Sequence, residues 1–201
     1  MSEPIDFLPI PLPVVPAGAI FDCDGTLADS MPLHYVAWHQ TLEPLGLPFP
    51  EEQFYAWGGV TAREIIVRLN AEHGMSVPPG ETAHAKEMAY AVLISQMKPL
   101  TKVVAEARRL NRLGVPLAVA SGGMNSLVEE TLRVLGIRDL FQTVAAAEDV
   151  QNGKPAPDVF LLAAERLGIP PEDCVVFEDA PAGFEAARRA GMRVVNVIPF
   201  L

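Results

Sequence analysis

Residues 17–26 read Ala-Gly-Ala-Ile-Phe-Asp-Cys-Asp-Gly-Thr, a short apolar run followed at once by an acidic loop. The run 17–21 predicts a buried strand of a parallel sheet. Asp22 and Asp24 then follow its carboxyl end, the edge at which open α/β sheets bind ligands. Gly25 permits a tight turn, and Thr26 offers a hydroxyl and a backbone N–H to phosphate oxygens. A solvated loop in which two acids occur by chance is the alternative.

Short apolar runs and helical patterns alternate through the second half of the chain. The further predicted strands are residues 115–120, 143–146, 174–177 and 193–197. Helices are predicted at 102–113, 126–135, 157–167 and 181–190, each followed by a glycine suited to a left-handed helix end (Gly114, Gly136, Gly168 and Gly191). This alternation predicts an α/β fold with a parallel sheet core flanked by helices.

The stretch 32–99 breaks the alternation. Helical patterns lie near 32–44, 51–56, 61–72 and 81–97, with no strand pattern between them. Apolar side chains at helical spacing are expected to give this stretch a small core of its own: Ile65, Ile66, Leu69, Ala71, Met88, Val92 and Leu93. We therefore expect a helical domain inserted after the first strand, with hinges near residues 30–33 and 98–101.

The N-terminus is rich in proline. Residues 1–16 contain five prolines and no periodic pattern, which predicts an extended arm that is ordered only where it packs on the body. The expected organisation is an arm at 1–16, an α/β core at 17–31 and 100–201, and a helical insertion at 32–99.

Composition narrows the class of protein. Half of the 201 residues are hydrophobic and a fifth are charged, as in soluble globular proteins. There is no apolar run of the roughly 20 residues that a membrane span needs, and no secretory leader pattern. Two cysteines fit a reducing compartment. The formal charge of −10 argues against nucleic acid as a partner. We expect a cytoplasmic monomer without nucleic-acid or membrane partners.

Two later loops carry residues suited to phosphate. Ser121 ends a predicted strand and is followed by Gly122, Gly123 and a helix, so a hydroxyl and exposed amides form a candidate phosphate cradle. A simple helix-capping serine is the alternative. Lys154 lies in a loop that two prolines stiffen, which fixes where its ammonium points. A solvated surface lysine is the alternative there.

An acidic pair follows the apolar strand 174–177. Glu178 and Asp179 repel each other at a buried strand end, so they need a counter-charge. Carboxylate oxygens, with water and substrate phosphate, are the ligands that Mg²⁺ prefers. All four sites fall at carboxyl ends of predicted strands, so the sheet should bring them into one crevice.

Asp22-Cys-Asp-Gly-Thr26, Ser121, Lys154 and Glu178-Asp179 match, in order and spacing, the four motifs of the haloacid dehalogenase superfamily of phosphatases. From residue 17 onward the chain resembles the β-phosphoglucomutase-like branch of that superfamily, and especially its fructose-1-phosphate phosphatase-like members. The resemblance implies a Rossmann-like parallel sheet core and identifies the helical insertion as a cap domain.

The resemblance also implies roles for the motif residues. Asp22 would be the nucleophile and a Mg²⁺ ligand, and Asp24 the general acid/base that gives the metal its backbone carbonyl. Asp179 would complete the metal site, with Glu178 as a second ligand or a water-mediated partner. The implied phosphate-binding residues are Thr26, Ser121, Gly122 and Lys154.

Cap residues are expected to choose the substrate. Gly58 to Arg63 resemble the family's specificity loop, in which Arg63 would reach a sugar or its phosphate; a solvated helix residue is the alternative. His34 matches a histidine that some relatives place near the acid/base, whereas Trp38 is expected in the cap core. Asn125, beyond the second motif, is retained.

The implied activity is the Mg²⁺-dependent hydrolysis of a small phosphorylated metabolite, a phosphosugar or a sugar-acid phosphate. The usual mutase has a lysine shortly after Ser121, where this chain has Gly122, Gly123 and Met124. A β-phosphoglucomutase remains the alternative. A phosphorylated signalling receiver is disfavoured by the long insertion, and a degenerate binding protein by the intact motifs.

Overall fold

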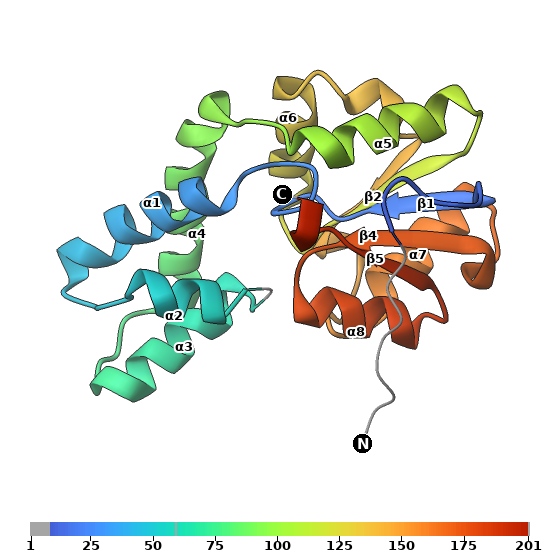
Figure 1. The fold of residues 1–201 in the computed structure, drawn as a ribbon. Coiled ribbons are helices and arrows are strands. Elements are labelled where there is room, and N and C mark those ends of the chain that lie inside the picture. The colour runs from blue at the N-terminus through green and yellow to red at the C-terminus, as the bar shows by residue number, and fades with distance from the viewer. Residues whose placement is uncertain (1–8, 59, 201) are drawn as a thin grey trace.

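The computed structural model describes residues 9–58 and 60–200 (Figure 1). Residues 1–8 of the predicted arm and Gly59 of the predicted specificity loop lie outside the described residues. The described part of the arm contacts the core. Leu12 is buried there, and its backbone N–H donates a hydrogen bond of 3.2 Å to the buried Glu106 carboxylate.

A parallel sheet of five strands, in the order β3-β2-β1-β4-β5, forms the centre of the described chain. The strands are β1 (Gly18–Phe21), β2 (Leu117–Ala120), β3 (Thr143–Ala145), β4 (Cys174–Glu178) and β5 (Arg193–Asn196). The predicted strands are confirmed, apart from small shifts at their ends. Because β1 lies in the middle, Phe21 pairs with Val119 on one side and Phe177 on the other. The loop after β1 is therefore flanked by the ends of β2 and β4.

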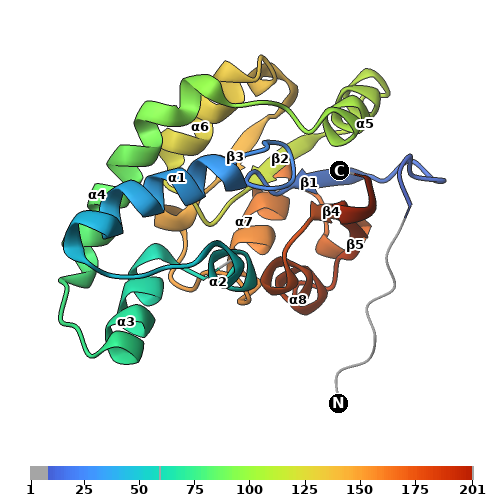
Figure 2. The same cartoon turned by 60° about the vertical axis from the view of Figure 1, so that its left-hand side comes forward.

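Helices cover both faces of the sheet. They are α5 (Thr101–Arg112), α6 (Asn125–Val134), α7 (Asp158–Leu167) and α8 (Pro181–Arg189). Apolar residues of α5 and α6 pack on one face and those of α7 and α8 on the other. Figure 2 shows these two pairs of helices on opposite sides of the sheet. The four glycines predicted to follow these helices all have φ between 64° and 77°. The predicted α/β class is thus confirmed.

Between β1 and α5 the chain forms α1 (Met31–Leu42), α2 (Glu51–Ala56), α3 (Ala62–His73) and α4 (Pro79–Leu93). Short 3₁₀ turns punctuate the chain: η1 (Glu43–Leu45), η2 (Ile94–Gln96), η3 (Arg138–Leu140), η4 (Ala147–Asp149), η5 (Pro171–Asp173) and η6 (Ile198–Phe200). Figure 1 shows α1 to α4 grouped beside the sheet, near the end at which β1 finishes. Among the described helices, none has both the length and the apolar character needed to cross a membrane.

The core of α1 to α4 differs in part from the expected one. Ile65, Ile66 and Leu69 are buried with Trp38 and Phe54 as predicted. The prediction is wrong for three residues: Ala71 is exposed, Met88 is 43% exposed and Val92 is 75% exposed. Leu93 is half-buried and packs against a cluster that contains Tyr90.

The cause is that α4 buries a polar face instead of its apolar one. The side chains buried there are Thr82, Lys86 and Tyr90, spaced one helical turn apart. The helix packs against α1 and α3, which turns this polar face toward the loop after β1. The division at residues 32 and 99 into cap and core stays a prediction.

Candidate active site

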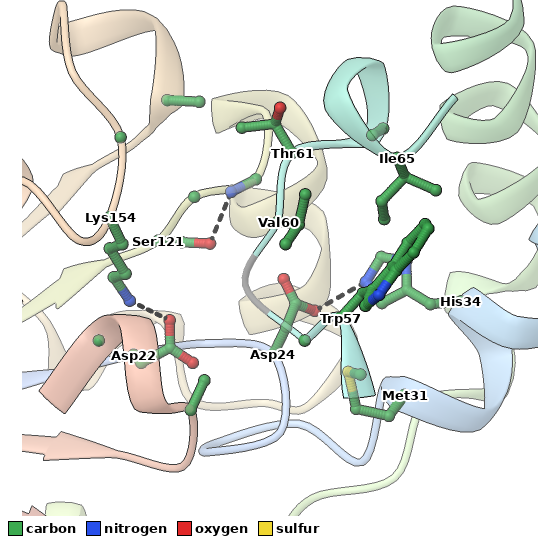
Figure 3. A pocket seen from close by; sticks show the side chains of 18 of the residues that line it. Asp22, Asp24, Met31, His34, Trp57, Val60, Thr61, Ile65, Ser121 and Lys154 are labelled. Carbon is green, nitrogen blue, oxygen red and sulfur yellow. Dashed lines mark hydrogen bonds and ion pairs between the residues drawn. The ribbon is translucent and has the colours of Figure 1, made fainter. Parts of the chain in front are cut away.

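The loop after β1 points its two aspartates in different directions. The Asp22 backbone N–H donates to the Phe177 carbonyl (3.0 Å), which ties the start of the loop to β4. Gly25 turns the chain with φ of 82°, a conformation that favours glycine. Cys23, between the acids, is buried in the hydrophobic core. As a result Asp22 faces Lys154 while Asp24 faces α1 and α4 (Figure 3).

A buried ammonium bridges two of the carboxylates. Lys154 Nζ lies 2.7 Å from Asp22 Oδ1 and 2.8 Å from Glu178 Oε2, and all three side chains are less than a tenth exposed. Burial, and then the charge of Glu178, raises the pKa of Asp22 well above its usual value, against the pull of Lys154. Burial opposes the charge on Lys154, but the two carboxylates together raise the pKa of its ammonium.

The carboxylates of Asp22, Glu178 and Asp179 each place an oxygen within 4.8 Å of the others, a grouping that could hold a metal ion. Burial and the neighbouring Glu178 raise the pKa of Asp179 to about 7. Such a rise is expected where acids cluster with too little positive charge nearby. Two glycines make room for the cluster. A Cβ on Gly25 would overlap the Asp179 carboxylate, and one on Gly183 the Glu178 carboxylate. Oxygen donors of this kind fit a hard divalent cation.

Thr26 lies behind this cluster. It is fully buried, and its hydroxyl donates to Asp179 Oδ1 (3.0 Å). Thr26 is not among the residues that line the cavity, and its hydroxyl orients a carboxylate; its role in phosphate binding stays a prediction. Sequence spacing alone did not separate these two uses of one side chain.

Ser121 and Gly122 belong to the loop that follows β2. The Ser121 hydroxyl accepts a hydrogen bond of 3.0 Å from the Gly123 backbone N–H. All three residues line the cavity. Because α6 begins only at Asn125, the candidate cradle is a loop before the helix and not its first turn.

Asp24 contacts side chains of the helical insertion. His34 Nε2 and Tyr90 Oη each lie 3.3 Å from Asp24 Oδ1, and Lys86 Nζ lies 2.8 Å from His34 Nδ1. The rings of His34 and Tyr90 stack at 3.8 Å. Burial alone would raise the pKa of Asp24, but His34 and Lys86 hold it below its usual value. Burial and Lys86 lower the pKa of His34, so its ring is neutral near pH 7.

The sequence pointed to His34 but missed Lys86 and Tyr90. Their only signal was a polar stripe, Thr82, Lys86 and Tyr90, at a spacing of four along a predicted helix. That pattern normally marks a solvated face. Burial of Lys86 lowers its pKa, against Glu87 and Asp24, which raise it.

These groups surround a cavity of about 400 Å³. Figure 3 shows Trp57 and Ile65 on the side of His34, and Asp22 and Lys154 on the other side of Asp24. Arg63 and Asn125 are not among the lining residues. Arg63 is exposed on α3, and Asn125 uses its backbone N–H to bind the Glu148 carboxylate (3.0 Å).

The sheet topology and the buried acids next to a lysine define an α/β enzyme whose site suits a metal ion and an anionic substrate. A family model of haloacid dehalogenase-like hydrolases matches residues 16–191, and the chain belongs to this family. The predicted resemblance and the predicted hydrolase class are confirmed.

Named relatives agree with this membership. A fructose-1-phosphate phosphatase of Escherichia coli (strain K12) is 39% identical over 90% of this chain and 96% of its own length. A β-phosphoglucomutase of Bacillus subtilis (strain 168) is 33% identical over 89% of this chain and 81% of its own. Among solved structures, CbbY of Rhodobacter sphaeroides in complex with phosphate has a TM-score of 0.79 at 29% identity, over 89% of this chain and 84% of that one. The phosphatase names support the predicted class of phosphoric monoester hydrolase.

Proposed function

We propose that the protein is a Mg²⁺-dependent phosphatase that hydrolyses a small phosphosugar through an aspartyl-phosphate on Asp22. The observation that carries the proposal is the ammonium of Lys154 between Asp22 and Glu178, next to a three-carboxylate cluster. The proposed division of labour places the chemistry in residues 17–31 and 100–201 and assigns substrate choice to a cap at 32–99.

Asp22 is the proposed nucleophile. Lys154 holds its Oδ1, and among the described residues its other oxygen has no hydrogen-bond partner, which leaves that oxygen for attack on phosphorus. A carboxylate that approaches a phosphate dianion meets charge repulsion, which Lys154 lowers by placing a positive charge where the two meet. The P–O bond to the sugar breaks as the bond to Asp22 forms.

Mg²⁺ fits the residues present. Asp22 and Asp179 would hold it, with Glu178 as a further ligand or a partner through water, and the Asp24 backbone carbonyl would complete the protein ligands. When bound, Mg²⁺ supplies positive charge that offsets the negative charge gathered on the transferring phosphoryl group. Gly25 and Gly183 keep the space that the carboxylates of Asp179 and Glu178 occupy.

Asp24 is the proposed acid and base. His34 and Tyr90 both contact its Oδ1 and so fix the orientation of the carboxylate. The lowered pKa of Asp24 makes the carboxylate the resting form, which suits the second step, in which it takes a proton from the attacking water. Arrival of a phosphate dianion raises the pKa of a neighbouring acid, which favours the protonated form needed to release the sugar oxygen.

We favour hydrolysis over mutase activity because the loop after Ser121 lacks a cation. Residues 122–124 carry no cation to hold a second phosphate. A mutase must hold a sugar bisphosphate while phosphate returns to the sugar. In this chain, the second phosphate of such a bisphosphate would have no cation beside it in this loop. The β-phosphoglucomutase reaction stays the second candidate because of the 33% identity to an enzyme of that name.

The test is Mg²⁺-dependent release of phosphate from fructose 1-phosphate, glucose 1-phosphate, glucose 6-phosphate and 6-phosphogluconate. Asp22→Asn should abolish turnover on every substrate. Asp29→Asn, on an exposed acid of the same loop, is the matched control and should keep wild-type rates. Phosphate release by Asp22→Asn at the wild-type rate would refute the nucleophile, and conversion of glucose 1-phosphate to glucose 6-phosphate without free phosphate would favour the mutase.

A further inference from the structure

The cavity has two unlike halves. The side next to Asp22 is polar, and the side formed by the helical insertion is mainly apolar. Its apolar members are Met31, Trp38, Phe54, Trp57, Val60 and Ile65. Trp57 packs against Phe49 and the guanidinium of Arg68, 5.6 Å from each. Trp57, Val60 and Ile65 all line the cavity (Figure 3), and we call these three side chains the apolar wall.

Charge in the cavity is strongly negative. Five carboxylates line it, those of Asp22, Asp24, Glu87, Glu178 and Asp179, against the two ammonium groups of Lys86 and Lys154. With the carboxylates ionised, the formal balance is −3, and a bound divalent cation brings it to −1. Binding of one phosphate dianion then makes the net charge of the cavity more negative still, which leaves no positive charge to bind a second anion.

Both lysines are occupied. Lys154 contacts Asp22 and Glu178. Lys86, the cation of the insertion side, contacts His34 Nδ1 (2.8 Å) and Glu87 Oε1 (3.1 Å). Among the described lining residues there is no further lysine or arginine. The half of the cavity that would hold the rest of the substrate therefore presents Glu87 and apolar carbon, with no unpaired cation.

We propose that this site selects monophosphate esters of uncharged sugars and discriminates against substrates with a second phosphate or a carboxylate. The inference rests on the proposed phosphatase function and makes its substrate class narrower. Glu87 neutralises Lys86, the cation that could otherwise bind a remote anion, and the apolar wall contacts the carbon face of the sugar. Aromatic side chains suit this role because a pyranose or furanose ring has a face of C–H groups.

Matched substrates test the proposal directly. Glucitol 6-phosphate and 6-phosphogluconate are both open chains and differ only in whether C1 is a hydroxymethyl group or a carboxylate. Fructose 1-phosphate and fructose 1,6-bisphosphate differ in a second phosphate. In each pair, we expect kcat/KM for the substrate with a single phosphate and no other anionic group to exceed that for the substrate with two anionic groups. The difference should be about tenfold or more, at constant Mg²⁺ and ionic strength.

Two variants assign the preference to residues. Glu87→Gln removes the negative charge and frees Lys86, so the preference within each pair should fall about tenfold. Glu81→Gln, on an exposed acid in the first turn of the same helix, is its control and should leave the preference unchanged. Trp57→Ala should raise KM for fructose 1-phosphate about tenfold while kcat changes little, whereas Tyr55→Ala, 48% exposed on the same helix, should not. Trp57→Phe, which keeps an aromatic face, should restore most of the affinity and shows that folding is intact.

The outcomes separate the inference from the function on which it rests. If no substrate releases phosphate, the proposed function fails. If both members of each pair are hydrolysed equally well, the phosphatase stands and the inference is wrong. A preference for the charged members that disappears in Arg63→Ala would also overturn it, because Arg63 would then act as the cation that the cavity lacks.

Discussion

Gly183 offers a test of the metal-site geometry through a residue that bears no functional group. It lies in α8 and faces Glu178, and a Cβ there would overlap the Cγ, Cδ and Oε1 atoms of that side chain. Glu178 has little freedom to move away. Its side chain is 2% exposed, accepts a 3.0 Å hydrogen bond from the Ala180 backbone N–H, and contacts Lys154. Gly183→Ala must therefore displace a buried carboxylate.

The expected cost follows from these contacts. Hydrogen bonds to a charged group contribute about 1.5–3 kcal/mol each, and the displaced Glu178 loses two of them. Replacing glycine by alanine inside a helix stabilises the helix by up to about 1 kcal/mol, which offsets part of this loss. The net loss is about 2–5 kcal/mol, which for a chain of this size corresponds to a fall in Tm of roughly 4–20 °C. Loss of one candidate ligand should also weaken Mg²⁺ binding.

Calorimetry with and without Mg²⁺ measures both effects. Gly80→Ala is the matched control, since it also lies in a helix but a Cβ there meets nothing within 4 Å. It should be neutral or slightly stabilising. Glu178→Ala removes every atom that the new Cβ would overlap, so adding Gly183→Ala in a Glu178→Ala background should cost little further stability. A Gly183→Ala variant as stable as Gly80→Ala, with unchanged Mg²⁺ affinity, would refute the close packing around Glu178.

Three further outcomes are expected. Mg²⁺ should raise the Tm of the wild type but not of Asp179→Asn, because relief of carboxylate repulsion requires the cluster; an equal rise contradicts the site. Lys154→Met should cost about 3–5 kcal/mol in urea unfolding, since it leaves buried acids without their cation; a loss below 1 kcal/mol contradicts it. Arg166 lowers the pKa of Asp149, so this acid stabilises the fold above its unfolded pKa, and the stabilisation is lost as pH falls through the folded pKa. Asp149→Asn should therefore cost about 1 kcal/mol at pH 7 and less at pH 3; an equal cost contradicts the ion pair.

Most of the fold was predictable because its signals are local. Apolar runs such as 174–177 are too short for helices, and glycines such as Gly168 mark where helices end. The order of the motifs then placed Asp22, Lys154 and Asp179 at one edge, since parallel strands share their carboxyl ends. Local signals were sufficient for these elements.

The contacts of Asp24 could not be predicted in full because they depend on how α4 is rotated. Sequence periodicity favoured burial of Met88 and Val92, and the structure buries Lys86 and Tyr90 instead. Burial of a lysine is costly without partners, so a hydropathy pattern disfavours it. Only the three-dimensional position of Asp24 and His34, far away along the chain, supplies those partners.

The central place of β1 in the sheet has a consequence for how the protein loses activity. Each side of this strand is hydrogen-bonded to a neighbour, so its amides should exchange with solvent only when the whole sheet opens. Asp22 follows it directly. Denaturant should therefore disrupt the geometry of Asp22, the proposed nucleophile, at the same concentration that unfolds the sheet. The helices α1 to α4, to which we assign substrate choice, can loosen at a lower concentration. In mild urea we expect an enzyme that still cleaves phosphate esters but discriminates among them less well.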